Sequence, residues 1–190
     1  MLNEFFVGIN IIKIQMQNNI ATLGIILLFP CFFYFVARYL CPVILLLGII
    51  PRRLRGLPGI IFAPLLHANF NHLFFNSIPL LVLSAFILIN GLYYYGLVTL
   101  YITLLSGSAI WLFAKNGLYI GASALITGYW GFLITNLYQD INPISIILGI
   151  LSLYYFGGIF LGLFPQQKGI SWQGHLLGLF AGILTSFIIN

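Results

Sequence analysis

The order of apolar and polar residues along the chain predicts a series of membrane-spanning helices. A helix needs about 20 predominantly apolar residues to cross a hydrocarbon core about 30 Å thick. Apolar runs separated by polar or turn-forming residues predict six spans, near residues 20–37, 72–90, 93–113, 122–138, 144–163 and 174–189. The fold class that follows is an all-α membrane protein, a bundle of six transmembrane helices.

Two shorter segments stand outside these spans. Residues 40–50 are apolar, but at about 1.5 Å per residue they reach only about half the thickness of the core, which favours a re-entrant or interfacial position. Residues 1–19 carry Glu4 early, Lys13 late and no small-residue cleavage pattern, so they are interpreted as an interfacial segment and not as a removable signal. Residues 20–190 then form a single six-span domain.

Composition supports this class, because 62% of the residues are hydrophobic and only 5% are charged. Such a chain cannot build a water-facing shell around a soluble core, so the lipid bilayer is its expected surrounding. The net charge of +5 comes from lysines and arginines near the predicted span ends, where interfacial anchors lie. Nucleic acid is excluded as a partner, since no soluble domain is present to carry a basic patch.

The alternating direction of the spans brings polar side chains together. The second, fourth and sixth predicted spans are parallel, so they begin on the same side of the membrane. The three histidines and a serine fall at these beginnings: His67 and His72 at the second span, Ser123 at the fourth and His175 at the sixth. The topology therefore predicts that these four groups share one membrane depth.

Ser123 and His175 are candidates for a nucleophile and its base. A serine hydroxyl is a poor nucleophile until a neighbouring base takes its proton, and neutral imidazole does so near pH 7. An ionisable group within a membrane is costly to keep, which favours a functional role for His175. Small residues in membrane helices usually serve packing, so packing stays open as the alternative for Ser123.

Small residues recur on one face of both helices that carry this pair. On the fourth span the series is Ser123, Thr127, Gly131 and Thr135, and on the sixth span Gly178 and Gly182 follow His175. Residues spaced by three or four positions lie on one helical stripe. Two stripes of small residues allow helices to pack closely, so we expect contact between these two spans.

The start of the second span offers hydrogen-bond donors for an oxyanion. His72 and Asn76 stand four positions apart and project from one helical face, and the backbone N–H of Ser123 could add a third donor. His67 lies five residues before His72 and follows Pro64, which places it at the helix entrance. Two roles stay open for His67: a structural histidine that bonds the adjacent loop, or a contact for water or substrate.

Carboxylates are too scarce to complete a catalytic triad. The chain has two acidic residues, Glu4 before the first span and Asp140 on the membrane side opposite Ser123, so neither can orient His175. A serine hydrolase would therefore work with a Ser–His dyad. A three-histidine site is the remaining metal option, but it leaves Ser123 and Asn76 unexplained, so no metal or cofactor is expected.

These residues resemble those of the rhomboid intramembrane serine proteases. His67, His72 and Asn76 match the family's HxxxxHxxxN pattern, "GAS" at 121–123 is similar to its GxSx motif, and "GHLLGLFAG" at 174–182 is similar to its AHxxGxxxG motif. The three signatures occur in the expected order on the expected spans. Their combination is far more specific than any one of them, and the resemblance covers the six-span core.

The resemblance implies an activity and roles for single residues. Ser123 would be the nucleophile, His175 the general base, and His72 with Asn76 part of the oxyanion hole. The implied substrates are single-pass membrane proteins, cleaved near the mouth of their transmembrane helix, where small or helix-weakening residues let the chain unwind. The implied enzyme is a serine-type endopeptidase.

The chain departs from the family pattern at several positions. Ala124 stands where glycine is common, and Gly174 stands where alanine is usual. Many members carry a tyrosine four residues after the serine, with its ring stacked on the base, but this chain has Thr127. The first loop lacks the Trp-Arg pair and carries "PRRLRG", which resembles a compact bacterial branch and implies a bacterial cell membrane.

Charge and resemblance predict opposite orientations. The catalytic side carries most of the basic residues, namely Arg38, Arg52, Arg53, Arg55, Lys115 and Lys168, while the other side carries Lys13. The positive-inside rule would place the catalytic side toward the cytoplasm. The resemblance implies the non-cytoplasmic face, and we expect that face because the motif match is the more specific signal.

Two other functions compete with a protease. A rhomboid-like protein could bind transmembrane helices without cutting them, but such a module has no need of both Ser123 and His175. A small channel or transporter is disfavoured, because the polar groups cluster at one end of the bundle and do not line a path through it.

Overall fold

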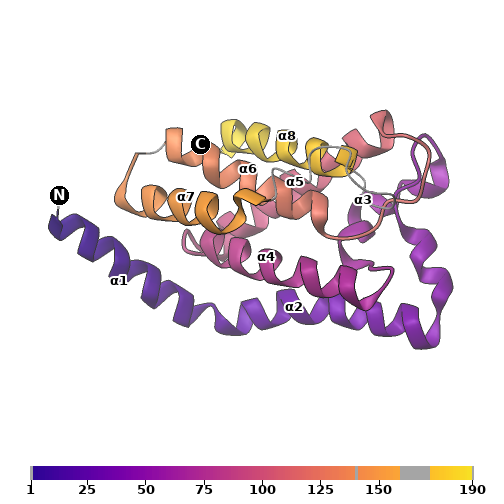
Figure 1. Ribbon diagram of the computed structural model, residues 1–190, viewed down its shortest axis with the longest axis horizontal. Coiled ribbons are helices and arrows are strands. Elements are labelled where there is room, and N and C mark those ends of the chain that lie inside the picture. Colours follow the sequence, from indigo (N-terminus) through magenta and orange to yellow (C-terminus); the bar gives the residue numbers. More distant parts are fainter. Residues whose placement is uncertain (1, 140, 159–171, 190) are drawn as a thin grey trace.

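The computed structural model describes residues 2–139, 141–158 and 172–189, and the described chain is helical (Figure 1). Its longer helices are α1 (Leu2–Asn18), α2 (Ile20–Phe35), α4 (Phe70–Leu88), α5 (Leu92–Phe113), α6 (Ser123–Gln139), α7 (Pro143–Phe156) and α8 (Trp172–Ile189). Each predicted span corresponds to one of the helices from α2 to α8. Residues 159–163, the end of the fifth predicted span, lie outside the described residues.

Four of the described helical segments are long and apolar enough to cross a membrane: Ile20–Leu40, α4, α5 and α8. The first consists of α2 and a π-helical turn, Val36–Leu40. Helices α6 and α7 have 17 and 14 residues and are therefore about 26 and 21 Å long. The structure confirms an all-helical, multi-pass membrane protein, with four full-length candidate spans where the sequence predicts six spans.

The connection between α2 and α4 consists of short helical turns. The predicted re-entrant piece is a 3-10 helix, Pro42–Leu47, and it is followed by the single turn α3 (Gly59–Phe62). Arg52 links this connection to the end of α5: its guanidinium donates hydrogen bonds to the carbonyls of Leu112 (3.2 Å) and Ala114 (2.7 Å). Carbonyls at a helix C-terminus lack intrahelical partners and carry partial negative charge, so a cation is favourable there.

Helix α6 lies at the centre of the bundle, in contact with α4, α5, α7 and α8 (Figure 1). Its Tyr129 and Phe132 are fully buried, and the surrounding helices contribute Leu83 and Ile102 to the same apolar core. The first span is peripheral, because only 11% of it is buried within the protein. Its apolar surface is therefore available to lipid.

Helices α6 and α8 share the most extensive contact among the described elements. A Cβ atom added at Gly182 would collide with the backbone carbonyl of Gly128, and one added at Gly178 would collide with that of Ala124. The two backbones touch directly at these positions. This contact confirms the expectation that small residues join the two helices.

We predict that Gly182→Ala destabilises the folded protein. The added methyl group must push α8 away from the Gly128 carbonyl, which overpacks the contact and costs about 1–3 kcal/mol. Gly24→Ala is the matched control, because no heavy atom lies within 4 Å of the position of its Cβ on α2. Equilibrium unfolding in mixed detergent micelles measures both variants, and equal stability of the two would contradict the assignment of α6–α8 as a tight contact.

Candidate active site

The turn before α6 positions Ser123. Gly121 has φ of +109°, a left-handed conformation that side chains rarely adopt, and its N–H donates to the Ala63 carbonyl at 2.8 Å. A Cβ atom at Gly121 would lie 2.5 Å from Nε2 of His72. Glycine is thus required here for two reasons, backbone conformation and the close approach of the His72 ring. The turn places the start of α6 against the start of α4.

The first turns of α4 hold His72 and Asn76 toward this turn. Asn69 caps the helix, because its Oδ1 accepts the His72 backbone N–H at 2.8 Å. Asn76 is buried, and its Nδ2 donates to the His72 carbonyl at 2.9 Å. An amide nitrogen carries two hydrogens, so a second N–H remains for another acceptor. The expectation that both side chains share one face is confirmed, since both approach the Cβ position of Gly121.

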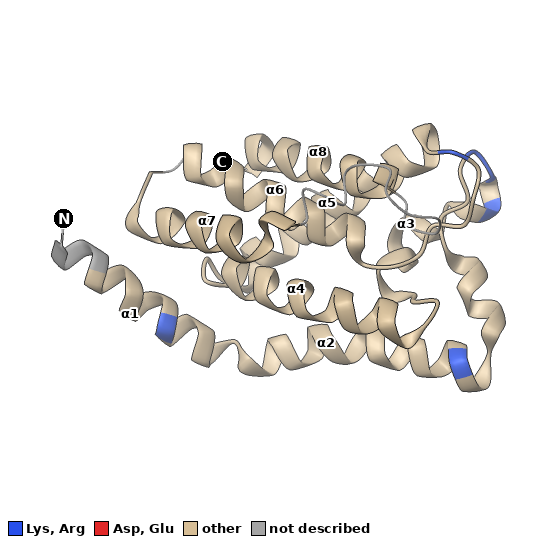
Figure 2. Ribbon diagram, in the orientation of Figure 1, with Lys and Arg blue, Asp and Glu red and all other residues tan. Residues whose placement is uncertain are grey.

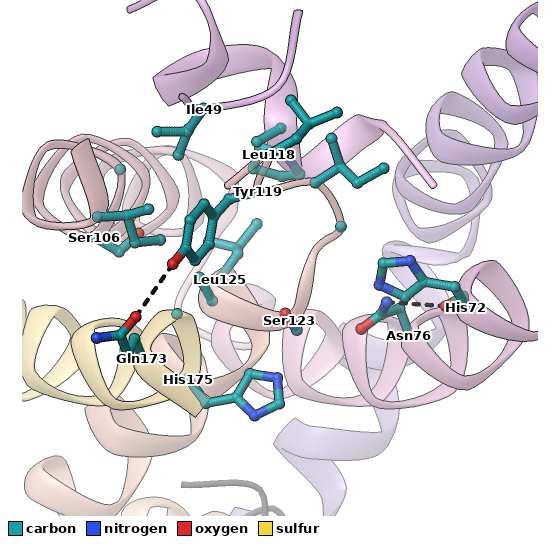
Figure 3. Close-up of a pocket in the computed structure, with 18 of the residues that line it drawn as sticks. Ile49, His72, Asn76, Ser106, Leu118, Tyr119, Ser123, Leu125, Gln173 and His175 are labelled. Carbon is teal, nitrogen blue, oxygen red and sulfur yellow. Dashed lines mark hydrogen bonds between the residues drawn. The ribbon is translucent and has the colours of Figure 1, made fainter. Parts of the chain in front are cut away.

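A cavity of about 950 Å³ brings these groups to the beginning of α8. Ser123, His175, His72 and Asn76 all line it. In Figure 3 the ring of His175 lies on one side of Ser123, and His72 and Asn76 lie on the other. The structure therefore gathers four of the five predicted site residues around one space.

His67, the fifth predicted residue, is not among the described residues that line this cavity. It is 1% exposed, and its ring meets the His72 ring edge-on with centroids 5.0 Å apart. Neither ring nitrogen has a hydrogen-bond partner in the described part of the chain. His67 lies in the connection before α4, where burial, and then the nearby His72, lowers its pKa from 6.5 to about 4. Its buried ring packs against His72 from within the protein.

Thr127 faces α8 and not the cavity. Its hydroxyl donates to the carbonyls of Ser123 and Ala124, both at 3.0 Å, and its side chain is 2% exposed. A Cβ atom at Gly178 would collide with the Thr127 hydroxyl oxygen. A larger side chain at position 127 would therefore conflict with the close contact of α6 and α8 as it exists here.

Charged groups are distributed unevenly around the site. Figure 2 shows basic residues gathered at the end of the bundle where α4, α6 and α8 begin, with a further one on α1. Lys115 is the charged residue among those that line the cavity. Asp140 and Lys168, to which the sequence assigns a membrane side, lie outside the described residues. Within the described residues, no group of three or more His, Cys, Asp or Glu side chains could hold a metal ion.

Sequence reasoning missed two polar residues that line the cavity, Tyr119 and Gln173. The hydroxyl of Tyr119 donates to Oε1 of Gln173 at 3.2 Å, a contact visible in Figure 3. Hydropathy does not reveal such a pair, because the two residues lie far apart in sequence. The one available indication in the sequence was the polar side chain of Gln173, two positions before His175.

Comparison with known proteins identifies the family that matches this chain. The Rhomboid domain matches residues 55–190. An uncharacterized protein of Mycobacterium bovis and one of Mycobacterium tuberculosis are each 41% identical over 152 residues, which cover 75% of this chain and 63% of the relative. An uncharacterized protein of Mycobacterium leprae is 39% identical over 142 residues, 70% of this chain and 56% of the relative. The matched part of the chain thus spans about three fifths of the length of these curated relatives.

We predict that His67 makes the folded state less stable in acid. Because its pKa is lowered to about 4 in the folded protein, the unfolded chain binds the extra proton first as pH falls below about 6.5, and the free energy of unfolding decreases. His67→Phe keeps a buried ring and removes this titration. Between about pH 7 and pH 4, the free energy of unfolding should decrease more steeply with falling pH for wild type than for His67→Phe. His72 and His175 are present in both proteins, so a difference between the two pH profiles of the free energy of unfolding is due to His67. Parallel profiles would show that folding does not lower the pKa of His67.

Proposed function

The chain belongs to the rhomboid family, and on this premise we propose that it is an intramembrane serine endopeptidase that uses a Ser–His dyad. Its substrates would be the transmembrane segments of single-pass membrane proteins. One observation carries the proposal: Ser123, His175, His72 and Asn76, from three helices, line a single cavity. A packing role for Ser123 alone does not account for two histidines and an asparagine around the same space.

Each residue has a chemical role in the proposed reaction. His175 takes the Ser123 hydroxyl proton as the oxygen attacks the scissile carbonyl, and it then gives that proton to the leaving amine. The tetrahedral oxyanion accepts hydrogen bonds from the His72 ring, the second Asn76 N–H and the Ser123 backbone N–H. Water, activated by His175, then releases the acyl group from Ser123. Charge develops on the oxyanion in the transition state, so these donors lower the barrier more than they favour substrate binding.

The proposed dyad lacks a carboxylate to orient its base. The sequence contains only Glu4 and Asp140 as acidic residues, so the orientation of His175 must come from packing and neutral hydrogen bonds. Gly178 lies one turn after His175 and presses against the Ala124 carbonyl. That contact fixes the distance between the helix that carries the base and the helix that carries the nucleophile.

We further propose that α6 and α7 complete a six-span bundle. Helix α6 is about 26 Å long, whereas the 22 residues of α5 extend about 33 Å. If the two helices are level at the opposite side of the bundle, the shorter α6 begins below the level at which α5 ends. Its N-terminal Ser123 would therefore face a recess at the membrane surface, where the polar side chains of Thr103 and Ser106 also line the cavity. Such a recess admits both water and an unwound segment of a substrate helix.

The proposed location is a bacterial cell membrane, with the site on the non-cytoplasmic face. The basic residues near the site favour the opposite face by the positive-inside rule. Arg52 weakens that objection, because its guanidinium is hydrogen-bonded to Leu112, Ala114 and Asn116 at the end of α5. This charge has a structural partner whatever the orientation of the chain.

We predict that a fluorophosphonate or isocoumarin probe labels the purified protein covalently at Ser123. Labelling should disappear in Ser123→Ala, which lacks the nucleophile, and in His175→Ala, which lacks the base. Mass spectrometry of the labelled protein identifies the modified residue. A folded wild type that cleaves no membrane substrate and takes no label would instead support the alternative, a rhomboid-like protein that binds transmembrane helices without cutting them.

We predict that Asn76→Ala lowers turnover by about one to three decades, because one oxyanion donor is lost. The Michaelis constant should change little, since the oxyanion forms only in the transition state. Asn10→Ala on the exposed surface of α1 is the matched control. Turnover of a transmembrane substrate in detergent or liposomes provides the measurement, and full activity of Asn76→Ala would remove this residue from the oxyanion hole.

A further inference from the structure

A hydrogen-bonded junction joins the loop before α6 to the first turn of α8. Oε1 of Gln173 accepts the backbone N–H of Lys115 at 3.0 Å and the hydroxyl of Tyr119 at 3.2 Å. The Tyr119 hydroxyl has a single hydrogen, which it shares between Gln173 Oε1 and the Lys115 carbonyl, 3.0 Å away. The three residues form a closed set of contacts, and the Tyr119–Gln173 part of it appears in Figure 3. We call this junction the Tyr119–Gln173 clasp.

The clasp is close in sequence to both members of the proposed dyad. Tyr119 precedes Ser123 by four residues, and Gln173 precedes His175 by two residues. Both Tyr119 and Gln173 line the same cavity as Ser123 and His175. Only a few residues of backbone separate the clasp from Ser123 and His175, so a movement of the clasp would also displace these two side chains.

The loop that carries Tyr119 is fixed on its other side. The backbone of Tyr119 forms a β-bridge with Ile49, with N···O distances of 3.0 and 2.9 Å. Two residues later, the Gly121 N–H is bonded to the Ala63 carbonyl at 2.8 Å. The loop thus has little freedom relative to the connection between α2 and α4. Gln173 extends this anchoring to α8.

The glycine contact between α6 and α8 does not by itself fix the axial position of one helix relative to the other. Gly178 and Gly182 bring the backbones together and so set the distance between α6 and α8, but a close approach does not by itself fix the position of one helix along the axis of the other. Directional hydrogen bonds at one end of the contact resist sliding along that axis. The clasp is located at the end that carries Ser123 and His175.

We propose that Tyr119 and Gln173 are positioning residues that set the register of His175 relative to Ser123. The inference rests on the proposed protease function. Proton transfer needs the base and the nucleophile within hydrogen-bond reach, and a displacement of about 1 Å costs on the order of 100-fold in rate. In a site without a carboxylate to orient the base, the Gln173 side chain supplies part of that orientation from a neutral acceptor.

The experiment compares variants that remove or keep the acceptor. Gln173→Met retains the length of the side chain without Oε1, and we expect kcat for a transmembrane substrate to fall about 10- to 100-fold while KM stays within about twofold. Gln173→Glu keeps an acceptor oxygen and should recover most of the loss. Tyr119→Phe keeps the ring and the Lys115 contact to Gln173, so its effect should be smaller. The losses in Tyr119→Phe and Gln173→Met should not add in the double variant, because they remove a shared hydrogen bond.

Tyr95→Phe is the matched control for a purely structural effect. The Tyr95 hydroxyl belongs to a separate hydrogen-bond network with Tyr129 and Ser84 in the interior of the bundle. We expect this variant to lose stability and to retain kcat in the folded protein. The inference is wrong if Gln173→Met retains wild-type kcat, or if its loss of kcat is matched by that of Tyr95→Phe. A wild type that is neither labelled by the serine probe nor active overturns the proposed function instead.

Discussion

Gly178 and Gly182 allow α8 to approach α6 until backbone meets backbone, and the remaining structure is arranged around that contact. Within a bilayer, helices gain no hydrophobic energy from leaving lipid, so close van der Waals packing between small residues must hold them together. The contact also matters for the proposed chemistry, because it joins the helix that begins with Ser123 to the helix that carries His175. Thr127 is part of the same contact and cannot carry a ring over the base without moving the two helices apart.

The end of the bundle at which the site lies is held by polar contacts of a different kind. Arg52 binds the carbonyls at the end of α5, and Ile49 pairs with Tyr119. Gly121 binds the carbonyl of Ala63, and Gln173 receives donors from the loop before α6. Glycine contacts thus bring the helices close, and directional hydrogen bonds between loops define their register. The proposed dyad has no carboxylate and would depend on both, because packing and neutral hydrogen bonds would have to orient its base.

In the proposed site, some of the predicted residues face the cavity and one is buried behind them. His72 and Asn76 face the turn before Ser123 and can donate to an oxyanion. His67 is buried behind His72, edge-on to its ring, so its contribution passes through that ring. The HxxxxHxxxN pattern therefore combines two residues at the cavity with one that supports them. This division follows from the non-helical connection before Phe70, which turns His67 away from the face shared by His72 and Asn76.

The order of apolar and polar residues along the chain predicted where the helices lie and which end of the bundle carries the polar groups. Hydropathy is a local property, so it predicted helices near those observed. The alternating direction of successive spans then placed Ser123, His72, Asn76 and His175 at the same end of the bundle. The burial of His67, the requirement for glycine at position 121 and the pairing of Tyr119 with Gln173 became visible only in the tertiary structure. Each of these depends on how closely segments distant in sequence approach one another. Distances of that kind are set by side-chain packing across several helices at once, and the pattern along one chain does not contain them.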